Sequence, residues 1–174
     1  MVNRFRIAAS AIVVLLTVFS IADRPLAEGL PLVEFPEKPQ APPLSLSLLN
    51  GDTFDIGSYR GRVVVVNFWA TWCAPCLKEM PVFEKAWSTL RQEGIVLVAV
   101  NLGDTPEKIQ RFLKHRPVTF PVLVDIESDT FDPWQIQSLP TTYVVGPDGR
   151  IHYGAIGDRK WDSPAILDTI RKLR

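Results

Sequence analysis

The alternation of apolar and polar residues predicts where the folded part of the chain begins. Residues 44–48 alternate leucine with serine, residues 50–52 (Asn-Gly-Asp) have turn composition, and residues 53–56 can return as a partner strand. This pattern predicts a β-hairpin. Residues 63–69 and 95–101 are continuous, largely β-branched apolar runs, which are typical of strands buried on both faces of a sheet.

Three segments have the features of helices. Residues 75–92 repeat apolar side chains near a 3.6-residue period, and Gly94 ends the segment. Thr105-Pro106 combines a capping residue with a proline suited to a first helical turn, and Asp162-Ser163-Pro164 does the same for a last helix. Strands are predicted at residues 121–125, 141–145 and 150–153. This order predicts an α/β fold with a mixed sheet, helices on both faces and an added N-terminal β-hairpin.

The N-terminal residues have a different pattern. Arg4 and Arg6 precede residues 7–22, which contain no charged side chain, and Ser20 and Ala22 provide small residues for a cleavage site. Residues 1–22 are therefore expected to be a signal peptide or an N-terminal membrane anchor. Both alternatives place the rest of the chain outside the cytoplasm, in a bacterial periplasm or on the outer face of the cytoplasmic membrane.

Residues 23–43 are expected to be an extended, proline-rich linker, and residues 44–174 a single domain. The linker contains six of the fifteen prolines, namely Pro25, Pro31, Pro36, Pro39, Pro42 and Pro43. The chain has 47% hydrophobic and 22% charged residues, a composition that excludes a disordered protein. Nineteen basic residues balance nineteen acidic ones, so no nucleic acid partner is expected.

The chain has two cysteines, Cys73 and Cys76, between a predicted strand and the start of a predicted helix. Unpaired N–H groups at a helix N-terminus favour an anion, so the Cys73 thiolate should be stabilised. The spacing allows one disulfide, in which Cys73 is the more exposed, attacking sulfur and Cys76 the resolving one. Because Ala74 and Pro75 add little to hold the anion, reduction of a target is favoured over its oxidation.

Other roles for the two cysteines fit less well. A zinc site needs two more ligands, and the only histidines, His115 and His152, are far from the cysteines in sequence. Leu77 occupies the position where a c-type haem attachment needs a histidine. A purely structural bridge would close too short a loop to stabilise the fold much.

Several motifs stand out around the two cysteines and further along the chain. They are residues 66–76 (VNFWATWCAPC), Glu79 and Pro81 on the following helix, and Leu139-Pro140-Thr141-Thr142. Together these motifs resemble the thioredoxin superfamily, specifically its TlpA/ResA/CcmG-type extracytoplasmic thiol-disulfide reductases. The resemblance covers about residues 44 to 174 and implies a thioredoxin-like fold for the predicted mixed sheet. It also implies a thiol-disulfide oxidoreductase, for which no cofactor and no metal are expected.

The resemblance also implies roles for residues outside the dithiol. Pro140 matches the family's cis-proline, whose loop, with Leu139 and Thr141 on either side, offers backbone groups to an extended substrate. Trp72 would present a flat apolar surface beside the attacking sulfur, although a half-buried core aromatic is an equal alternative.

The acidic residue of the site is less well defined by the sequence. Asn67 departs from thioredoxin, which has a buried proton-accepting aspartate at that position. In TlpA/ResA-type members an acidic residue after the next strand approaches the dithiol, and Asp104 matches that position; a helix-capping role is the alternative. Glu79 is a further catalytic candidate, although a charged residue on a helix is more often solvated.

The leading functional hypothesis is a disulfide reductase that acts on protein substrates through a mixed disulfide with Cys73. The resemblance suggests apocytochrome c or copper-site cysteines as substrates, and a membrane thiol carrier as electron donor. The enzyme is expected to be a monomer that contacts the membrane through its N-terminal segment. The alternative is a Cu(I)-binding, thioredoxin-like metallochaperone, in which the thiolates hold the soft ion and Met80 could assist.

Overall fold

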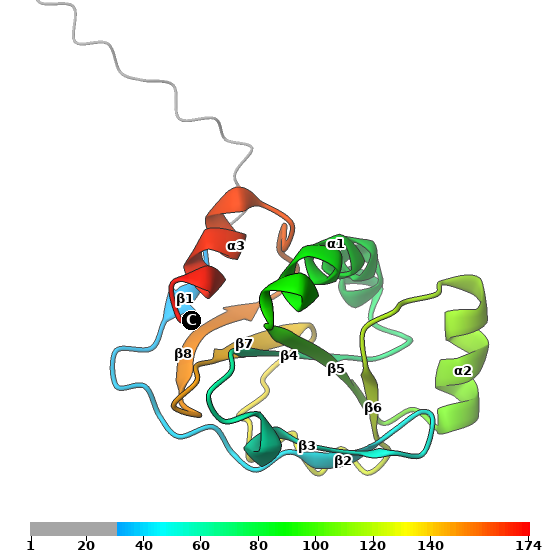
Figure 1. Ribbon diagram of the computed structural model, residues 1–174. Helices are drawn as coiled ribbons and strands as arrows, with labels where there is room; N and C mark the ends of the chain where they lie inside the picture. Colours follow the sequence, from blue (N-terminus) through cyan, green and yellow to red (C-terminus); the bar gives the residue numbers. More distant parts are fainter. Residues whose placement is uncertain (1–30) are drawn as a thin grey trace, which may run out of the picture.

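The computed structural model describes residues 31–174, which form one mixed β-sheet with helices packed against it (Figure 1). Eight strands lie in the order β1-β8-β7-β4-β5-β6-β2-β3. The strands are β1 (Val33–Glu34), β2 (Ser45–Leu48), β3 (Thr53–Asp55), β4 (Val64–Trp69), β5 (Val96–Leu102), β6 (Val122–Asp125), β7 (Thr141–Val145) and β8 (Ile151–Ile156). The helices are α1 (Ala74–Leu90), α2 (Pro106–His115), α3 (Pro164–Arg171), and the short 3-10 helices η1 (Ile56–Tyr59) and η2 (Arg91–Glu93).

The central strands come from the two continuous apolar runs of the sequence. Every residue of β4 and β5 is buried, and the two strands pair in parallel from Val64 opposite Val96 to Trp69 opposite Asn101. β6 continues the parallel part, and β7 pairs antiparallel on the other side of β4. The carboxyl ends of β4 and β5 therefore meet the start of β7 at one edge of the sheet, where a site is expected in such folds.

Alternation along each strand produces two apolar layers. Val65, Trp69 and Leu97 point to the face covered by α1, α2 and α3, with α3 over the β8 side and α2 beside β6 (Figure 1). Neighbouring strand residues such as Phe68 point to the other face. There η1 and a turn carrying Trp134 complete the layer, so short helical segments rather than long helices cover this second face.

The N-terminal hairpin is confirmed, because β2 and β3 pair antiparallel and β2 also pairs with β6. The boundary of the packed domain differs from the prediction. Residues 31–43, which were expected to be linker, lie along the sheet: β1 pairs with β8, the Phe35 N–H donates to the His152 carbonyl oxygen, and Gln40 forms a bridge with Arg150. The prolines of this segment lie outside the two paired residues of β1, where they remove no ladder hydrogen bond.

The predicted signal peptide or anchor, residues 1–22, and the first part of the predicted linker lie outside the described residues. None of the helices between residues 31 and 174 combines the length and the apolar character needed to cross a bilayer.

Candidate active site

The two cysteines lie at the N-terminus of α1 and form a disulfide. The loop after β4 delivers Cys73 to the N-cap position, where its Sγ accepts a hydrogen bond from the Cys76 N–H at 3.3 Å. Cys73 is 5% exposed and Cys76 is fully buried, so the predicted order of accessibility is confirmed. The donor at Cys73 Sγ and the helix N-terminus both favour the Cys73 thiolate once the bond is reduced.

The loop before β7 lies at the same edge of the sheet. Its peptide bond between Leu139 and Pro140 is cis, as the resemblance implies for this proline. The Pro140 carbonyl oxygen accepts a hydrogen bond from the Gly157 N–H, and the Thr141 hydroxyl donates to the Ser138 carbonyl oxygen. These bonds fix the loop to the end of β8 and leave Leu139 only partly buried.

Exposed apolar side chains surround this edge of the sheet. Trp72, which precedes the attacking cysteine, is 68% exposed, so the half-buried core alternative for this residue is wrong. Ile156 at the end of β8 is 53% exposed. It belongs to an apolar groove on the far side of the proline loop, whose lining includes Val33, Phe35, Thr141, Tyr143 and Ile156. An apolar partner segment could make contact on either side of the loop.

Glu79 is buried on α1, which corrects the expectation that it would be a solvated surface charge. Its side chain is 2% exposed. It follows Cys76 by three positions in the helix, so both side chains are on the same helix face. The carboxylate accepts hydrogen bonds from Asn67 Nδ2 at Oε1, at 2.9 Å, and from Trp161 Nε1 at Oε2, at 3.0 Å.

Burial raises the pKa of Glu79 to about 7, although the hydrogen bonds from Trp161, Asn67 and the Arg159 backbone act to lower it. The negative charge of Asp158 adds to the increase. A carboxyl group with a pKa near neutrality can both accept and return a proton under physiological conditions.

Asn67 explains how a site without the thioredoxin aspartate can still contain a buried acid. The amide cannot take up a proton, but it lies on β4 facing α1 and holds the Glu79 carboxylate, while also donating to the Thr142 hydroxyl at 3.0 Å. The acid is therefore contributed by the helix rather than by the strand. Glu79 was a catalytic candidate from the sequence, and the i, i+3 spacing from Cys76 is the sequence signal that places it on the face of the resolving cysteine.

Asp104 is also buried, at 1% exposed, but its carboxylate is already engaged. Its Oδ2 accepts hydrogen bonds from the Thr71 backbone N–H at 2.8 Å and from Asn101 Nδ2 at 3.1 Å, and its Oδ1 pairs with Lys108. Burial alone would raise the pKa of Asp104, but these partners outweigh it and hold the pKa below its usual range. The N-cap of α2 is Thr105, whose hydroxyl accepts from the Lys108 N–H, so the capping alternative for Asp104 is wrong.

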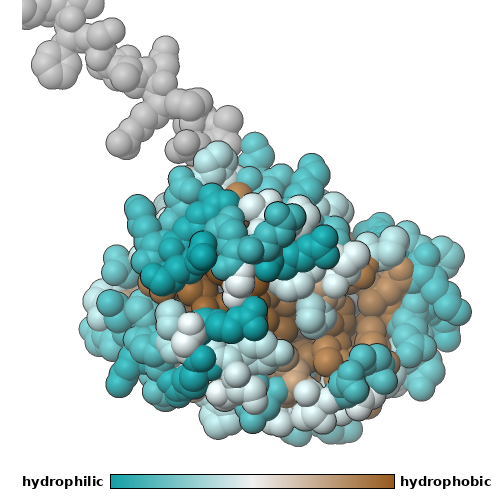
Figure 2. All heavy atoms as spheres, viewed as in Figure 1, coloured by the Kyte–Doolittle hydropathy of each residue, from teal (hydrophilic) through white to brown (hydrophobic). Residues whose placement is uncertain are grey.

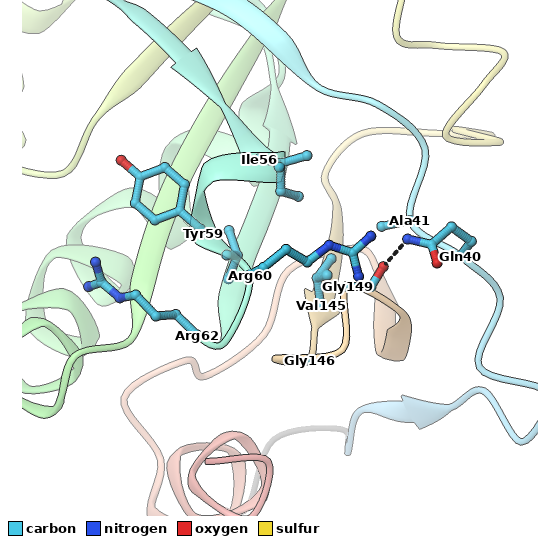
Figure 3. Close-up of a pocket in the computed structure, with 11 residues that line it drawn as sticks. Gln40, Ala41, Ile56, Tyr59, Arg60, Arg62, Val145, Gly146 and Gly149 are labelled. Carbon is cyan, nitrogen blue, oxygen red and sulfur yellow. Dashed lines mark hydrogen bonds between the residues drawn. The ribbon is translucent and has the colours of Figure 1, made fainter.

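Two other hollows lie at the opposite end of the sheet. One is bordered by η1, the start of β4 and the turn after β7, where Gln40 donates to the Gly149 carbonyl oxygen and the Arg60 side chain lies beside Gly149 (Figure 3). The other is an apolar groove between α2 and the start of β6, lined in part by Leu49, Leu113 and Phe120; Figure 2 shows apolar side chains gathered beside α2. Neither hollow contains a cysteine.

The model of the AhpC/TSA family matches residues 38–154, which include the disulfide and the cis-proline. The chain belongs to this family. Residues 31–174 contain no cluster of three or more histidine, cysteine or acidic residues that could hold a metal ion.

This chain is similar to the thiol-disulfide oxidoreductase ResA of Bacillus subtilis, with 34% identity over 115 residues. The aligned residues cover 66% of this chain and 64% of ResA. It is 31% identical over 123 residues to ResA of Halalkalibacterium halodurans, covering 69% of this chain and 70% of that protein. The match therefore spans less than two thirds of the B. subtilis relative.

Solved structures confirm the thioredoxin-like fold. A putative thiol:disulfide interchange protein DsbE from Chlorobium tepidum matches with a TM-score of 0.68 and 25% identity, covering 82% of this chain and 95% of that chain. StoA from Bacillus subtilis has the same fold, with a TM-score of 0.63 and 23% identity, covering 76% of this chain and 96% of that chain.

Proposed function

We propose that this protein is a thiol-disulfide oxidoreductase that reduces disulfides in protein substrates outside the cytoplasm. The observation that carries the proposal is the Cys73–Cys76 disulfide at the N-terminus of α1, with the buried Glu79 on the same helix face as Cys76. The ResA relatives are named thiol-disulfide oxidoreductases, which supports the same reaction.

The proposed reaction has two exchange steps. In the reduced enzyme, the Cys73 thiolate attacks one sulfur of the substrate disulfide, so that the substrate S–S bond breaks and a mixed disulfide forms. The Cys76 thiolate then attacks Cys73 Sγ, which releases the second substrate thiolate and restores the Cys73–Cys76 disulfide. Two electrons and two protons pass from the dithiol to the substrate.

Glu79 is proposed to accept the proton of Cys76 before the second step. Cys76 is fully buried, so water cannot easily remove this proton. A carboxylate on the same helix face with a pKa of about 7 is suited to the task. Asp104 is proposed to position the site instead, because its carboxylate holds the Thr71 N–H in the loop that leads to Cys73.

The substrate segment is proposed to lie in an extended conformation along the cis-proline loop, with backbone contacts from Leu139 and Thr141 and apolar contact from Trp72. The proposed substrates are cysteine pairs awaiting haem attachment or copper, and the proposed electron donor is a membrane thiol carrier. Residues 7–22 are proposed to export or anchor the chain, and a mass measurement on protein recovered from membranes would establish whether that segment is cleaved.

The decisive test traps the mixed disulfide with a defined probe. The Cys76→Ser variant is reduced and mixed with a peptide whose single cysteine is held in a disulfide with thionitrobenzoate, which leaves as the free thiolate when Cys73 attacks the peptide sulfur. We expect a covalent protein–peptide adduct by mass spectrometry, because the resolving thiol is missing while Cys73 remains reactive. The matched control is Cys73→Ser, in which the remaining cysteine is buried and no adduct should form.

Absence of the adduct with Cys76→Ser would contradict a reductase role. If the reduced wild-type protein then bound Cu(I) tightly, with one ion per two thiols, a metallochaperone would replace the reductase as the function of this site.

A further inference from the structure

Trp161 lies in the loop between β8 and α3, outside the CxxC and cis-proline motifs, and its side chain contacts Glu79. Its side chain is 1% exposed and stacks on Phe83 of α1, with ring centroids 4.6 Å apart and planes at 18°. The indole N–H leaves the stack and donates to Glu79 Oε2 at 3.0 Å. Packing alone would need the ring but not the hydrogen bond.

The partners of the Glu79 carboxylate are all donors. Asn67 donates to one oxygen and Trp161 to the other, and the Arg159 backbone N–H adds a third bond. An indole N–H can only donate, so it is satisfied by a carboxylate but gains nothing from the hydrogen of a carboxylic acid. The Trp161 hydrogen bond therefore favours the ionised form of Glu79 and opposes the effect of burial.

Few charged groups compete with Trp161 at this carboxylate. β4 faces it with the neutral side chain of Asn67, which also donates to the Thr142 hydroxyl on β7. From the loop, Asp158 acts as a negative charge. The Arg159 guanidinium donates to the carbonyl oxygens of Gly157 and Asp158. Among the groups that lower the pKa of Glu79, Trp161 has the largest effect.

We propose that Trp161 is a positioning residue for dithiol exchange: its indole N–H fixes the Glu79 carboxylate on the Cys76 face of α1 and favours its charged form. The proposal rests on the proposed function for its catalytic consequence, which is to set the pH at which Glu79 accepts a proton from Cys76. The hydrogen bond itself is a property of the oxidised protein and can be tested without any turnover.

The first measurement uses the full wild-type chain with its disulfide intact, so that neither cysteine titrates. The carboxyl carbon of Glu79 and the indole N–H of Trp161 are followed by NMR as the pH is varied. We expect both signals to change with one midpoint near 7, because the indole proton senses the charge of its acceptor. An indole signal that does not change through the Glu79 midpoint would overturn the proposal without any variant.

The second measurement compares two tryptophan variants. Trp161→Phe keeps an aromatic ring against Phe83 and removes the donor, so the Glu79 midpoint should rise by about one unit. Trp134→Phe is the matched control, because Trp134 is equally buried but donates to the Pro43 carbonyl oxygen on the other face of the sheet. An unchanged Glu79 midpoint in Trp161→Phe, or an equal rise in both variants, would refute the positioning role.

The peptide-trapping experiment separates this proposal from the proposed function. If Cys76→Ser forms the adduct but Trp161→Phe leaves the Glu79 midpoint unchanged, only the role of Trp161 fails. If the midpoint rises in Trp161→Phe but no adduct forms with Cys76→Ser, the hydrogen bond is established and the reductase function fails.

Discussion

Replacing Glu79 with glutamine removes a buried acid whose titration should be visible in the stability of the whole domain. Burial raises the pKa of Glu79 to about 7 in the folded state, compared with 4.5 for the ordinary side chain. Between these two values the folded protein binds a proton that the unfolded chain has lost, so stability falls as the pH rises. Above the folded pKa this contribution is lost, and below 4.5 it is fully present.

The size of the effect follows from the pKa difference. One pKa unit corresponds to about 1.4 kcal/mol, so a rise from 4.5 to about 7 amounts to about 3 kcal/mol over the full range. Most of it, about 2 to 3 kcal/mol, falls between pH 5 and pH 8. Glutamine has no proton to lose in this range, and its hydrogen-bond mismatch with the two donors adds an offset that does not change with pH.

Urea unfolding of the oxidised wild type and of Glu79→Gln, at several pH values between 5 and 8, measures this contribution. Subtracting the two free energies of unfolding cancels the groups that both proteins share. We expect the wild type to lose about 2 to 3 kcal/mol relative to the variant as the pH rises. A difference that stays constant across this range would refute a titrating Glu79 and, with it, the proposed proton acceptor.

Two further variants test the surroundings of the dithiol. Asp104→Asn removes the anionic acceptor of the Thr71 N–H and the partner of Lys108, so the loop that leads to Cys73 is held less firmly and we expect slower exchange with a peptide disulfide. An unchanged exchange rate would leave Asp104 with no effect on the thiols. Trp72→Ala should change the free energy of unfolding by less than about 0.5 kcal/mol, because the side chain is 68% exposed. It should slow the reaction with a peptide disulfide more than the reaction with dithiothreitol. Equal losses with both reagents would exclude substrate contact by this ring.

The sequence predicted those elements whose signals are local. β4 and β5 follow from unbroken apolar runs, and the N-terminus of α1 follows from the position of the cysteines between a strand and a helix pattern. The order of exposure of Cys73 and Cys76 could be predicted because helix geometry alone decides it. The cis bond before Pro140 was implied by the resemblance rather than by any local pattern.

The features that the sequence did not predict depend on contacts between distant residues. Glu79 was a catalytic candidate, but its burial depends on hydrogen bonds from Asn67 on β4 and from Trp161, 82 positions away along the chain, which no local pattern indicates. Residues 31–43 have the composition of a linker, and their place on the sheet depends on pairing with β8 more than one hundred residues later. Neither contact leaves a periodic pattern in the sequence.

The two outermost strands, β1 with two residues and β3 with three, are shorter than the central strands β4 and β5. Long exposed edge strands can pair with strands of neighbouring molecules, which leads to aggregation. Short edge strands offer few unpaired backbone groups for such pairing. A protein that binds extended polypeptides can then confine strand addition to one place. In the mechanism proposed above, that place is the loop preceding β7, so that substrate docking and disulfide exchange share one end of the sheet.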